Sequence, residues 1–276
     1  MRKFILFGST VVLVLLNSSK NFAQRLSVQT SFGYSIGTGI TDLGGNYSLF
    51  HPNSQGFALE TDPNVGPGSF GSGYDLDFTI GYSVNEFLSC GLEFTYHHSG
   101  FFGWDSSDKN YRLSNSWQAN IIRLTPFIKR DFGTQSLNPF LMIGPVLKIG
   151  GSINEYYLYV HQRPLDAWQL ETQFFGGISF GVMFGGGLEY HLYKSLTFVL
   201  YAKYIYQTWA PKHSEQIDVN DKNYLFKVDF VDNVAPYIST NNPQSTKAPT
   251  YNNPFSGVSI NMGLKFSIGK MAADTK

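Results

Sequence analysis

The stretch LSVQTSFGYSIG, residues 26–37, alternates between two kinds of side chain at every step. The first set is bulky and mostly apolar: Leu26, Val28, Thr30, Phe32, Tyr34 and Ile36. The second set is small or polar: Ser27, Gln29, Ser31, Gly33, Ser35 and Gly37. Because successive side chains of a strand point to opposite faces, the stretch predicts a β-strand with one apolar and one polar face.

The same alternation returns at seven later places in the chain. It predicts strands that begin near the following residues: Tyr74, Leu88, Trp117, Phe140, Phe175, Leu196 and Val258. Each pattern lasts for about a dozen residues. That is longer than the ~5–6 residues common in soluble sheets, and it suits a tilted transmembrane strand of roughly 9–11 residues plus its ends.

The connections between these strands alternate in length. Those after the second, fourth and sixth strands are short, whereas the long ones run from Thr38 to Gly73, from Ser99 to Ser116, from Ser152 to Phe174 and from Trp209 to Ser256. Short periplasmic turns and long extracellular loops distinguish the two ends of bacterial membrane barrels. We therefore predict an all-β fold, an eight-stranded antiparallel up-and-down transmembrane β-barrel in the cell outer membrane.

Composition and the first residues agree with export to a membrane. Only 14% of the residues are charged, against roughly 25% in soluble domains. Two basic residues precede an apolar run from Phe4 to Leu16, which predicts a secretory signal peptide cleaved near Ala23. The run is shorter than the ~20 residues of a helical anchor, and no later stretch is apolar for long enough to span a bilayer as a helix. We expect a signal peptide over residues 1–23 and one barrel domain over residues 24–276.

Alternation alone does not say which face meets lipid, because a secreted lipocalin-like barrel also alternates. Its polar face would need many charged residues for solvation, but here that face is mostly Gly, Ser and Thr, which suit a crowded interior. The charges that do fall on it must be paired if they are buried. We predict a luminal ion network, with Glu93 and Arg123 at similar depth. Its members are Asp75, Asp77, Glu93, Arg123 and Lys203.

The tryptophans fall in the long connections or at their junctions with strands. They are Trp104, Trp117, Trp168 and Trp209. Indole rings favour the headgroup level of a bilayer. We predict that these four residues form the outer aromatic girdle.

One region resembles a known family. It comprises IRLTPFIKR (residues 122–130), a short turn, and NPFLMIGP (residues 138–145). This region resembles the PorT-like outer-membrane β-barrel family of the Bacteroidota, and the resemblance implies a membrane-embedded barrel with no common catalytic residues. Proline cannot donate to a β-ladder, so we expect Pro126 and Pro145 to mark bulges.

Nothing in the sequence points to a metal, a cofactor or a nucleic acid. The 20 basic and 20 acidic residues balance, which gives no basic surface for nucleic acid. Adjacent His97 and His98 point to opposite faces of a strand and cannot share a metal. The single cysteine, Cys90, can form no disulfide within the chain.

The leading functional hypothesis is a non-enzymatic barrel embedded in outer-membrane lipid. It would bind another envelope protein or a surface ligand through the connections from Thr38 to Gly73 and from Trp209 to Ser256, because binding usually resides on loops of a rigid scaffold. Within the second connection, the alternation of Tyr224, Phe226, Val228 and Phe230 predicts a strand. Two alternatives stay open: a porin-like narrow pore, and a lipid-modifying enzyme that uses His97 with Ser99.

Overall fold

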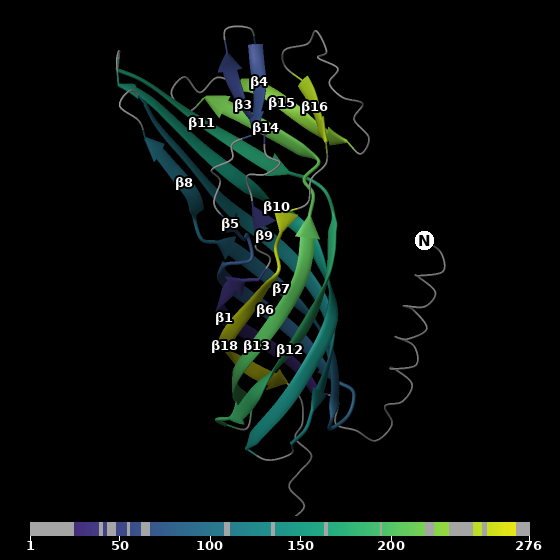
Figure 1. Ribbon diagram of the computed structural model, residues 1–276. Helices are drawn as coiled ribbons and strands as arrows, with labels where there is room; N and C mark the ends of the chain where they lie inside the picture. The colour runs from purple at the N-terminus through teal and green to yellow at the C-terminus, as the bar shows by residue number, and fades with distance from the viewer. Residues whose placement is uncertain are drawn as a thin grey trace, which may run out of the picture.

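The computed structural model describes residues 25–38, 41–42, 48–53, 56–61, 67–107, 111–133, 136–162, 165–193, 195–218, 224–231, 245–249 and 253–268. The expected signal peptide lies outside these residues. All regular elements of the described part are strands (Figure 1). None of its residues belongs to a helix that is long and apolar enough to cross a membrane.

Eight antiparallel strands close into a barrel (Figure 1). In order around the wall they are β1 (Arg25–Gly37), β6 (Gly73–Ser83), β7 (Leu88–Ser99), β9 (Tyr111–Asp131), β10 (Leu137–Gln162), β12 (Ser179–His191), β13 (Leu196–Trp209) and β18 (Gly257–Ile268). The pairing of β18 with β1 completes the circle. The predicted eight-stranded up-and-down barrel is confirmed.

The pleat of each strand separates two environments. Phe32 and Ile260 are 54% and 62% exposed, whereas their chain neighbours Ser31 and Asn261 are buried in the lumen. The same alternation surrounds the barrel with an apolar belt, which includes Leu76, Phe78, Phe94, Ile128, Leu141, Ile143, Phe180, Phe184, Leu200, Met262, Leu264 and Phe266. A soluble barrel would turn these side chains inward, so the belt excludes the lipocalin-like alternative and makes this a membrane-spanning barrel.

The lumen is narrow because small residues line much of it. A Cβ atom added at Gly33 would lie 1.9 Å from Asn261 Oδ1, and one added at Gly187 would lie 2.3 Å from the carbonyl oxygen of Leu200. Neither position has room for a methyl group. The glycine-rich face predicted to be internal is therefore close-packed, as expected for eight strands.

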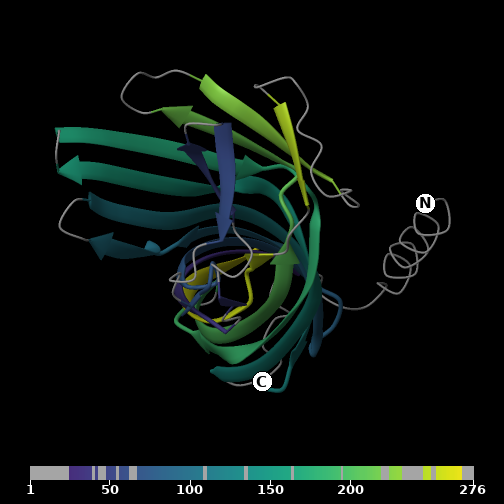
Figure 2. The same cartoon turned by 45° about the horizontal axis from the view of Figure 1, so that its top comes forward.

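At one end of the barrel the connections are short, and at the other the strands continue outward. Beyond the barrel, β9 and β10 belong to a sheet with five further strands. They are β8 (Phe102–Ser107), β11 (Leu165–Phe175), β14 (His213–Asp218), β15 (Tyr224–Val231) and β16 (Ser245–Pro249). These strands form a sheet in the order β8-β9-β10-β11-β14-β15-β16, which we call the outer sheet (Figure 2). The predicted strand at residues 224–230 is confirmed as β15, but other parts of the long connections are also strands rather than loops.

Shorter strands complete the outer end. They are β2 (Thr41–Asp42) paired with β5 (Pro67–Gly68), β3 (Ser48–Asn53) paired with β4 (Gly56–Thr61), and β17 (Asn253–Pro254) paired with β13. The β3–β4 hairpin lies at the same end of the molecule as the outer sheet in both views (Figures 1 and 2).

The prolines of β9 and β10 do not mark bulges, contrary to the prediction. The register between the two strands is the same before and after Pro126 and Pro145, with Ile143 opposite Ile128 and Leu147 opposite Leu124. The shift comes instead between Lys148 and Gly150. There Gly151 adopts φ +104°, a conformation that side chains with a Cβ rarely adopt. Glycine, rather than proline, therefore provides the irregularity where the hairpin leaves the barrel.

Candidate functional site

The middle of the lumen holds a centre built around one lysine, which we call the lysine centre. Lys203 Nζ on β13 lies 2.8 Å from Asp77 Oδ1 on β6 and 2.9 Å from Glu93 Oε1 on β7. Tyr201 donates its hydroxyl hydrogen to Asp77 Oδ2 at 2.8 Å, and Thr95 donates to Asp77 Oδ1 at 2.7 Å. All of these side chains are buried. Because these residues come from both sides of the barrel, the centre ties the wall together across the lumen.

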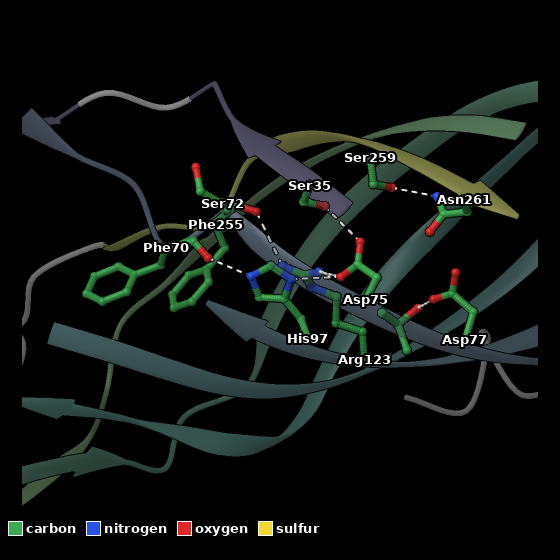
Figure 3. A network of polar contacts seen from close by, with 12 residues as sticks. Ser35, Phe70, Ser72, Asp75, Asp77, His97, Arg123, Phe255, Ser259 and Asn261 are labelled. Atoms are coloured by element: carbon green, nitrogen blue, oxygen red, sulfur yellow. Dashed lines mark hydrogen bonds and ion pairs between the residues drawn. The ribbon is translucent and has the colours of Figure 1, made fainter. Parts of the chain in front are cut away.

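Nearer the outer end lies the histidine centre (Figure 3). His97 Nδ1 is 2.7 Å from Asp75 Oδ1, and His97 Nε2 is 2.8 Å from the carbonyl oxygen of Phe70. Ser35 donates to the other carboxylate oxygen of Asp75 at 2.8 Å. A carboxylate and a carbonyl are both acceptors, so the two ring nitrogens of His97 face acceptors on either side. The centre therefore joins His97 to Asp75 and to the backbone of Phe70.

Arg123 links this centre to the opposite wall. Its Nη1 is 4.0 Å from Asp75 Oδ1, its Nε donates to Gln207 Oε1 at 2.9 Å, and its Nη2 donates to the carbonyl oxygen of Phe255 at 3.3 Å. The carboxylates of the two centres thus lie close to Lys203, Arg123 and His97. Buried charges persist only when they are paired in this way.

The structure thus places all five residues of the expected ion network in the lumen, where they divide between the two centres. Glu93 pairs with Lys203, and Arg123 interacts with Asp75. No ion pair joins Glu93 to Arg123 in the described part of the chain. Strand parity reveals which residues face inward, but pairing depends on which side chains reach across the lumen from the far wall.

A second group of charges closes the periplasmic end. Lys129 Nζ contacts Glu189 Oε1 at 2.5 Å and Asp131 Oδ1 at 2.9 Å. Lys265 Nζ contacts Glu189 Oε2 at 2.8 Å. Strand parity predicts their inward direction, because each lies an even number of positions from another luminal residue of its strand.

Aromatic side chains close the outer end of the lumen, and we call them the aromatic cap. Phe70 stacks on Phe255 with ring centroids 5.1 Å apart, and Trp117 stacks on Phe174 at 5.6 Å. Trp209 packs against Phe255 at 5.8 Å. All five rings are buried. Phe70 and Phe255 come from connections without regular periodicity, so no sequence signal could have located them.

The cap corrects the predicted aromatic girdle. Trp117 and Trp209 are 6% and 1% exposed and point into the barrel, so the prediction was wrong for both. Each shares the parity of luminal residues, since Trp117 lies six positions from Arg123 and Trp209 six from Lys203. The backbones of Trp104 and Trp168 belong to β8 and β11, and their side chains lie outside the described part.

Between the periplasmic charges and the lysine centre lies a small luminal cavity of about 30 Å³. Its walls include Thr79, Glu93, Lys129, Tyr201 and Lys265. This volume has room for about two water molecules.

The proposed catalytic pair, His97 and Ser99, has its polar atoms engaged elsewhere. Both His97 nitrogens are bonded as described above. Ser99 Oγ accepts from the amide of Ala119 at 2.7 Å and donates to the carbonyl of Gly100 at 3.1 Å. The two side chains therefore do not form a nucleophile and base.

One titratable group stands out on the face of the outer sheet that continues the lumen. Glu155 is buried on β10 beyond the apolar belt and accepts a hydrogen bond from Asn115 Nδ2 at 2.8 Å. Burial raises the pKa of the Glu155 carboxyl to about 7, against the opposing effect of that hydrogen bond. The stability of the outer sheet therefore depends on pH near neutrality, where Glu155 loses its proton.

Comparison with known proteins adds little beyond the architecture. No family model matches the chain, and no curated protein matches it. Among solved structures it is similar to neisserial surface protein A (9% identity, 88% of this chain and 96% of the other, TM-score 0.36). It is also similar to a major outer membrane protein of Thermus thermophilus (11%, 89% and 100%, 0.46) and to the outer membrane protease OmpT of Escherichia coli (8%, 91% and 98%, 0.28).

Such distant likeness carries no argument about function. The location follows instead from the barrel itself, whose closed wall, outward apolar belt and filled polar lumen are those of a bacterial outer-membrane barrel.

Proposed function

We propose that this outer-membrane barrel is a non-enzymatic binding protein whose extracellular part engages another envelope protein or a surface ligand. The observation that carries the proposal is the outer sheet, which extends the barrel wall beyond the membrane and ends in β8 on one side and β16 on the other. In the described part neither strand has a partner on its outer edge. Free strand edges can pair with a strand of another protein.

The connections expected to bind a partner lie at this end of the molecule (Figure 1), and the second of them supplies β14, β15 and β16 of the outer sheet. The segment from Thr38 to Gly73 supplies β2 to β5, and the segment from Trp209 to Ser256 supplies β14 to β17. A rigid sheet presents a binding edge at a lower entropic cost than a flexible loop. The arrangement therefore favours binding by strand pairing.

The pore is the less favoured alternative, because the aromatic cap, the ion centres and the periplasmic charges fill the lumen. In planar bilayers we expect the purified protein to give no stepwise conductance. Regular single-channel steps that disappear when the protein is omitted would favour the pore instead.

The enzymatic alternative is disfavoured by the contacts of His97 and Ser99. Lipid A acylation should be the same with the wild-type protein and with His97→Ala. A change in acylation that depends on His97 would contradict a purely binding role.

We also propose a relation to the PorT-like barrels of the Bacteroidota. It rests on residues 122–130 and 138–145, which form the two sides of the periplasmic β9–β10 turn. Homologues that keep both segments and occur within that phylum would support it, whereas matches spread evenly over other phyla would count against it.

The binding proposal is tested by placing a photo-crosslinking amino acid at Ser106 on β8 and at Thr246 on β16, in cells that make the protein. Met262, on the lipid-facing side of β18, is the matched control. We expect a discrete protein or ligand adduct from an edge position and none from Met262. Equal labelling at all three positions, or none at either edge, would reject binding through the sheet edges.

A further inference from the structure

A group of polar side chains lies on the outward face of the wall, where the apolar belt ends. We call it the polar outer cluster, and it consists of His98 on β7, Gln118 and Asn120 on β9, Ser152 and Asn154 on β10, and Gln173 on β11. Strand register makes it continuous, since His98 lies opposite Asn120, Asn120 opposite Ser152, and Asn154 opposite Gln173. The cluster therefore crosses four neighbouring strands.

Its height places it in the lipid headgroup layer. Tyr96 and Ile122, which are 45% and 42% exposed, form the upper edge of the belt on β7 and β9. His98 and Asn120 each follow two residues farther out, a step of roughly 7 Å. The headgroup region on each side of the ~30 Å hydrocarbon core is of similar thickness. Lipid headgroups are thus the molecules in reach of the cluster.

The histidine of the cluster is held by two amide side chains. Asn120 Oδ1 can only accept, so His98 Nδ1 donates to it at 2.6 Å. His98 Nε2 then accepts from the Gln118 amide nitrogen at 3.2 Å. Tyr96 also donates to Asn120 Oδ1, at 2.9 Å. The cluster is accordingly a network of polar side chains held in fixed orientations.

The same network leaves polar atoms available for a ligand. On β10 and β11, Gln173 Nε2 donates to Ser152 Oγ at 3.2 Å, and Ser152 donates to Asn154 Oδ1 at 3.3 Å. Within the described part of the chain, Asn120 Nδ2 and Gln173 Oε1 have no hydrogen-bond partner, whereas Gln118 is buried and supports His98 from within the network. Donors and acceptors are thus presented together, as a hydroxyl group requires, since it both donates and accepts.

Aromatic rings lie beside these amides. Phe101 is 67% exposed, and its ring centroid is 6.3 Å from that of Tyr156 on β10. Asn154 Nδ2 donates to the Tyr156 hydroxyl at 3.4 Å, which connects the rings to the cluster. Exposed rings next to oriented amides suit a sugar, whose C–H faces stack on aromatic rings while its hydroxyls bond to the amides.

The surrounding charges disfavour a phosphate. Glu171 on β11 lies opposite Tyr156 on the same outward face, and its carboxylate would repel an anion. The outward-facing cations of β9, Arg112 and Arg130, are eight and ten residues from Asn120, roughly 26 and 33 Å along the strand. On the opposite wall, β1 and β13 carry exposed Ile36 and Tyr206 near their outer ends, so the cluster is confined to one side.

We propose that the polar outer cluster binds the sugar headgroup of an outer-leaflet glycolipid. The ligand is recognised by its hydroxyl groups and ring faces, and its acyl chains lie along the apolar belt below. The site lies on the outward face of the barrel wall and faces the surrounding lipid. It is separate from the strand edges at which a protein partner would dock.

The test titrates three lipids into the purified full-length protein in mild detergent and counts bound lipid by native mass spectrometry. Digalactosyldiacylglycerol presents sugar without phosphate, phosphatidylglycerol presents phosphate without sugar, and phosphatidylcholine is the background. We expect the galactolipid to bind best, with little dependence on salt. Equal binding of all three lipids would overturn the proposal. So would salt-sensitive preference for phosphatidylglycerol, which would indicate phosphate recognition.

Variants locate the site. The double variant His98→Ala with Asn120→Ala should weaken galactolipid binding about tenfold, since it removes several hydrogen-bonding groups. Gln173→Ala should weaken it less, and Gln169→Ala should not change it, because Gln169 lies on the same face of β11 but farther from the membrane. Each variant is checked for the heat-modifiable gel migration of a folded barrel. If the double variant does not fold, Phe101→Ala and Gln173→Ala take its place, and unchanged binding in both would overturn the proposal.

Discussion

Replacing Lys203 by methionine should be among the most damaging single changes in the barrel. Its ammonium group is fully buried and holds Asp77 and Glu93 at 2.8 and 2.9 Å. Removing it leaves two carboxylates without their common cation. Breaking a buried ion pair from one side costs about 3–5 kcal/mol, so we expect Lys203→Met to lower the free energy of unfolding by about that amount.

The control is Lys265→Met at the periplasmic end. The Lys265 side chain is 17% exposed, and its partner Glu189 keeps a second cation, Lys129, at 2.5 Å. Its loss should cost only about 1 kcal/mol, as is usual for partly solvated pairs. Comparing the two variants therefore distinguishes the cost of leaving buried carboxylates without a cation from the cost of losing a lysine side chain.

The assay is urea unfolding in lipid vesicles, followed by tryptophan fluorescence and by gel migration without heating. A triple variant that adds Asp77→Asn and Glu93→Gln to Lys203→Met should recover most of the lost stability, because the carboxylates no longer carry charge. If Lys203→Met unfolds within about 1 kcal/mol of the wild type, or if the triple variant is no more stable than the single one, the lysine centre does not hold the walls together as described.

Three further outcomes are expected. His97→Ala should increase backbone hydrogen exchange at Phe70, whose carbonyl loses its donor, and should lower the free energy of unfolding by about 2–3 kcal/mol. Unchanged exchange would contradict the role of the His97–Phe70 hydrogen bond in holding this segment. Because the pKa of Glu155 is raised to about 7 in the fold, the folded state binds the proton more tightly. The stability of the outer sheet should therefore fall as pH rises from about 4.5 to about 7, by at most about 3 kcal/mol, and Glu155→Gln should abolish that slope in hydrogen exchange. Gly144→Ala should impair folding, because its Cβ would lie 2.0 Å from the Pro126 carbonyl oxygen; Gly150→Ala is the control, since its Cβ meets only side-chain atoms of Ile122, at 3.6 Å or more. Equal folding yields for the two glycine variants would refute this packing.

Strand positions and facing could be predicted because the alternation of side chains is local. The pattern of residues 26–37 matches β1 closely, and parity alone put Glu93 and Lys203 inside the barrel. It also reveals the inward direction of Trp209. Our prediction of a girdle there relied on the general preference of tryptophan for interfaces, and the parity of the strand overrode that preference.

Contacts across the lumen could not be predicted in the same way. The partner of Glu93 is Lys203 on the far wall, and that pairing depends on strand tilt and side-chain reach rather than on sequence spacing. Phe70 and Phe255 enter the cap from irregular segments, where no repeating pattern marks a residue as buried. Of the outer sheet, the sequence predicts only β15, and it predicts loops for the other long connections.

The central claim is that lipid, and not a protein core, contacts the apolar side of every barrel strand. A cysteine scan over residues 258–264 of β18 tests it, in a Cys90→Ala background with a small fluorophore at each position and brominated lipids as quenchers. We expect strong quenching at Val258, Ile260, Met262 and Leu264, and weak quenching at the residues between them. The claim would be contradicted if the residues between these four were quenched more strongly than the four themselves. It would also be contradicted if no position were quenched more in brominated than in unbrominated vesicles.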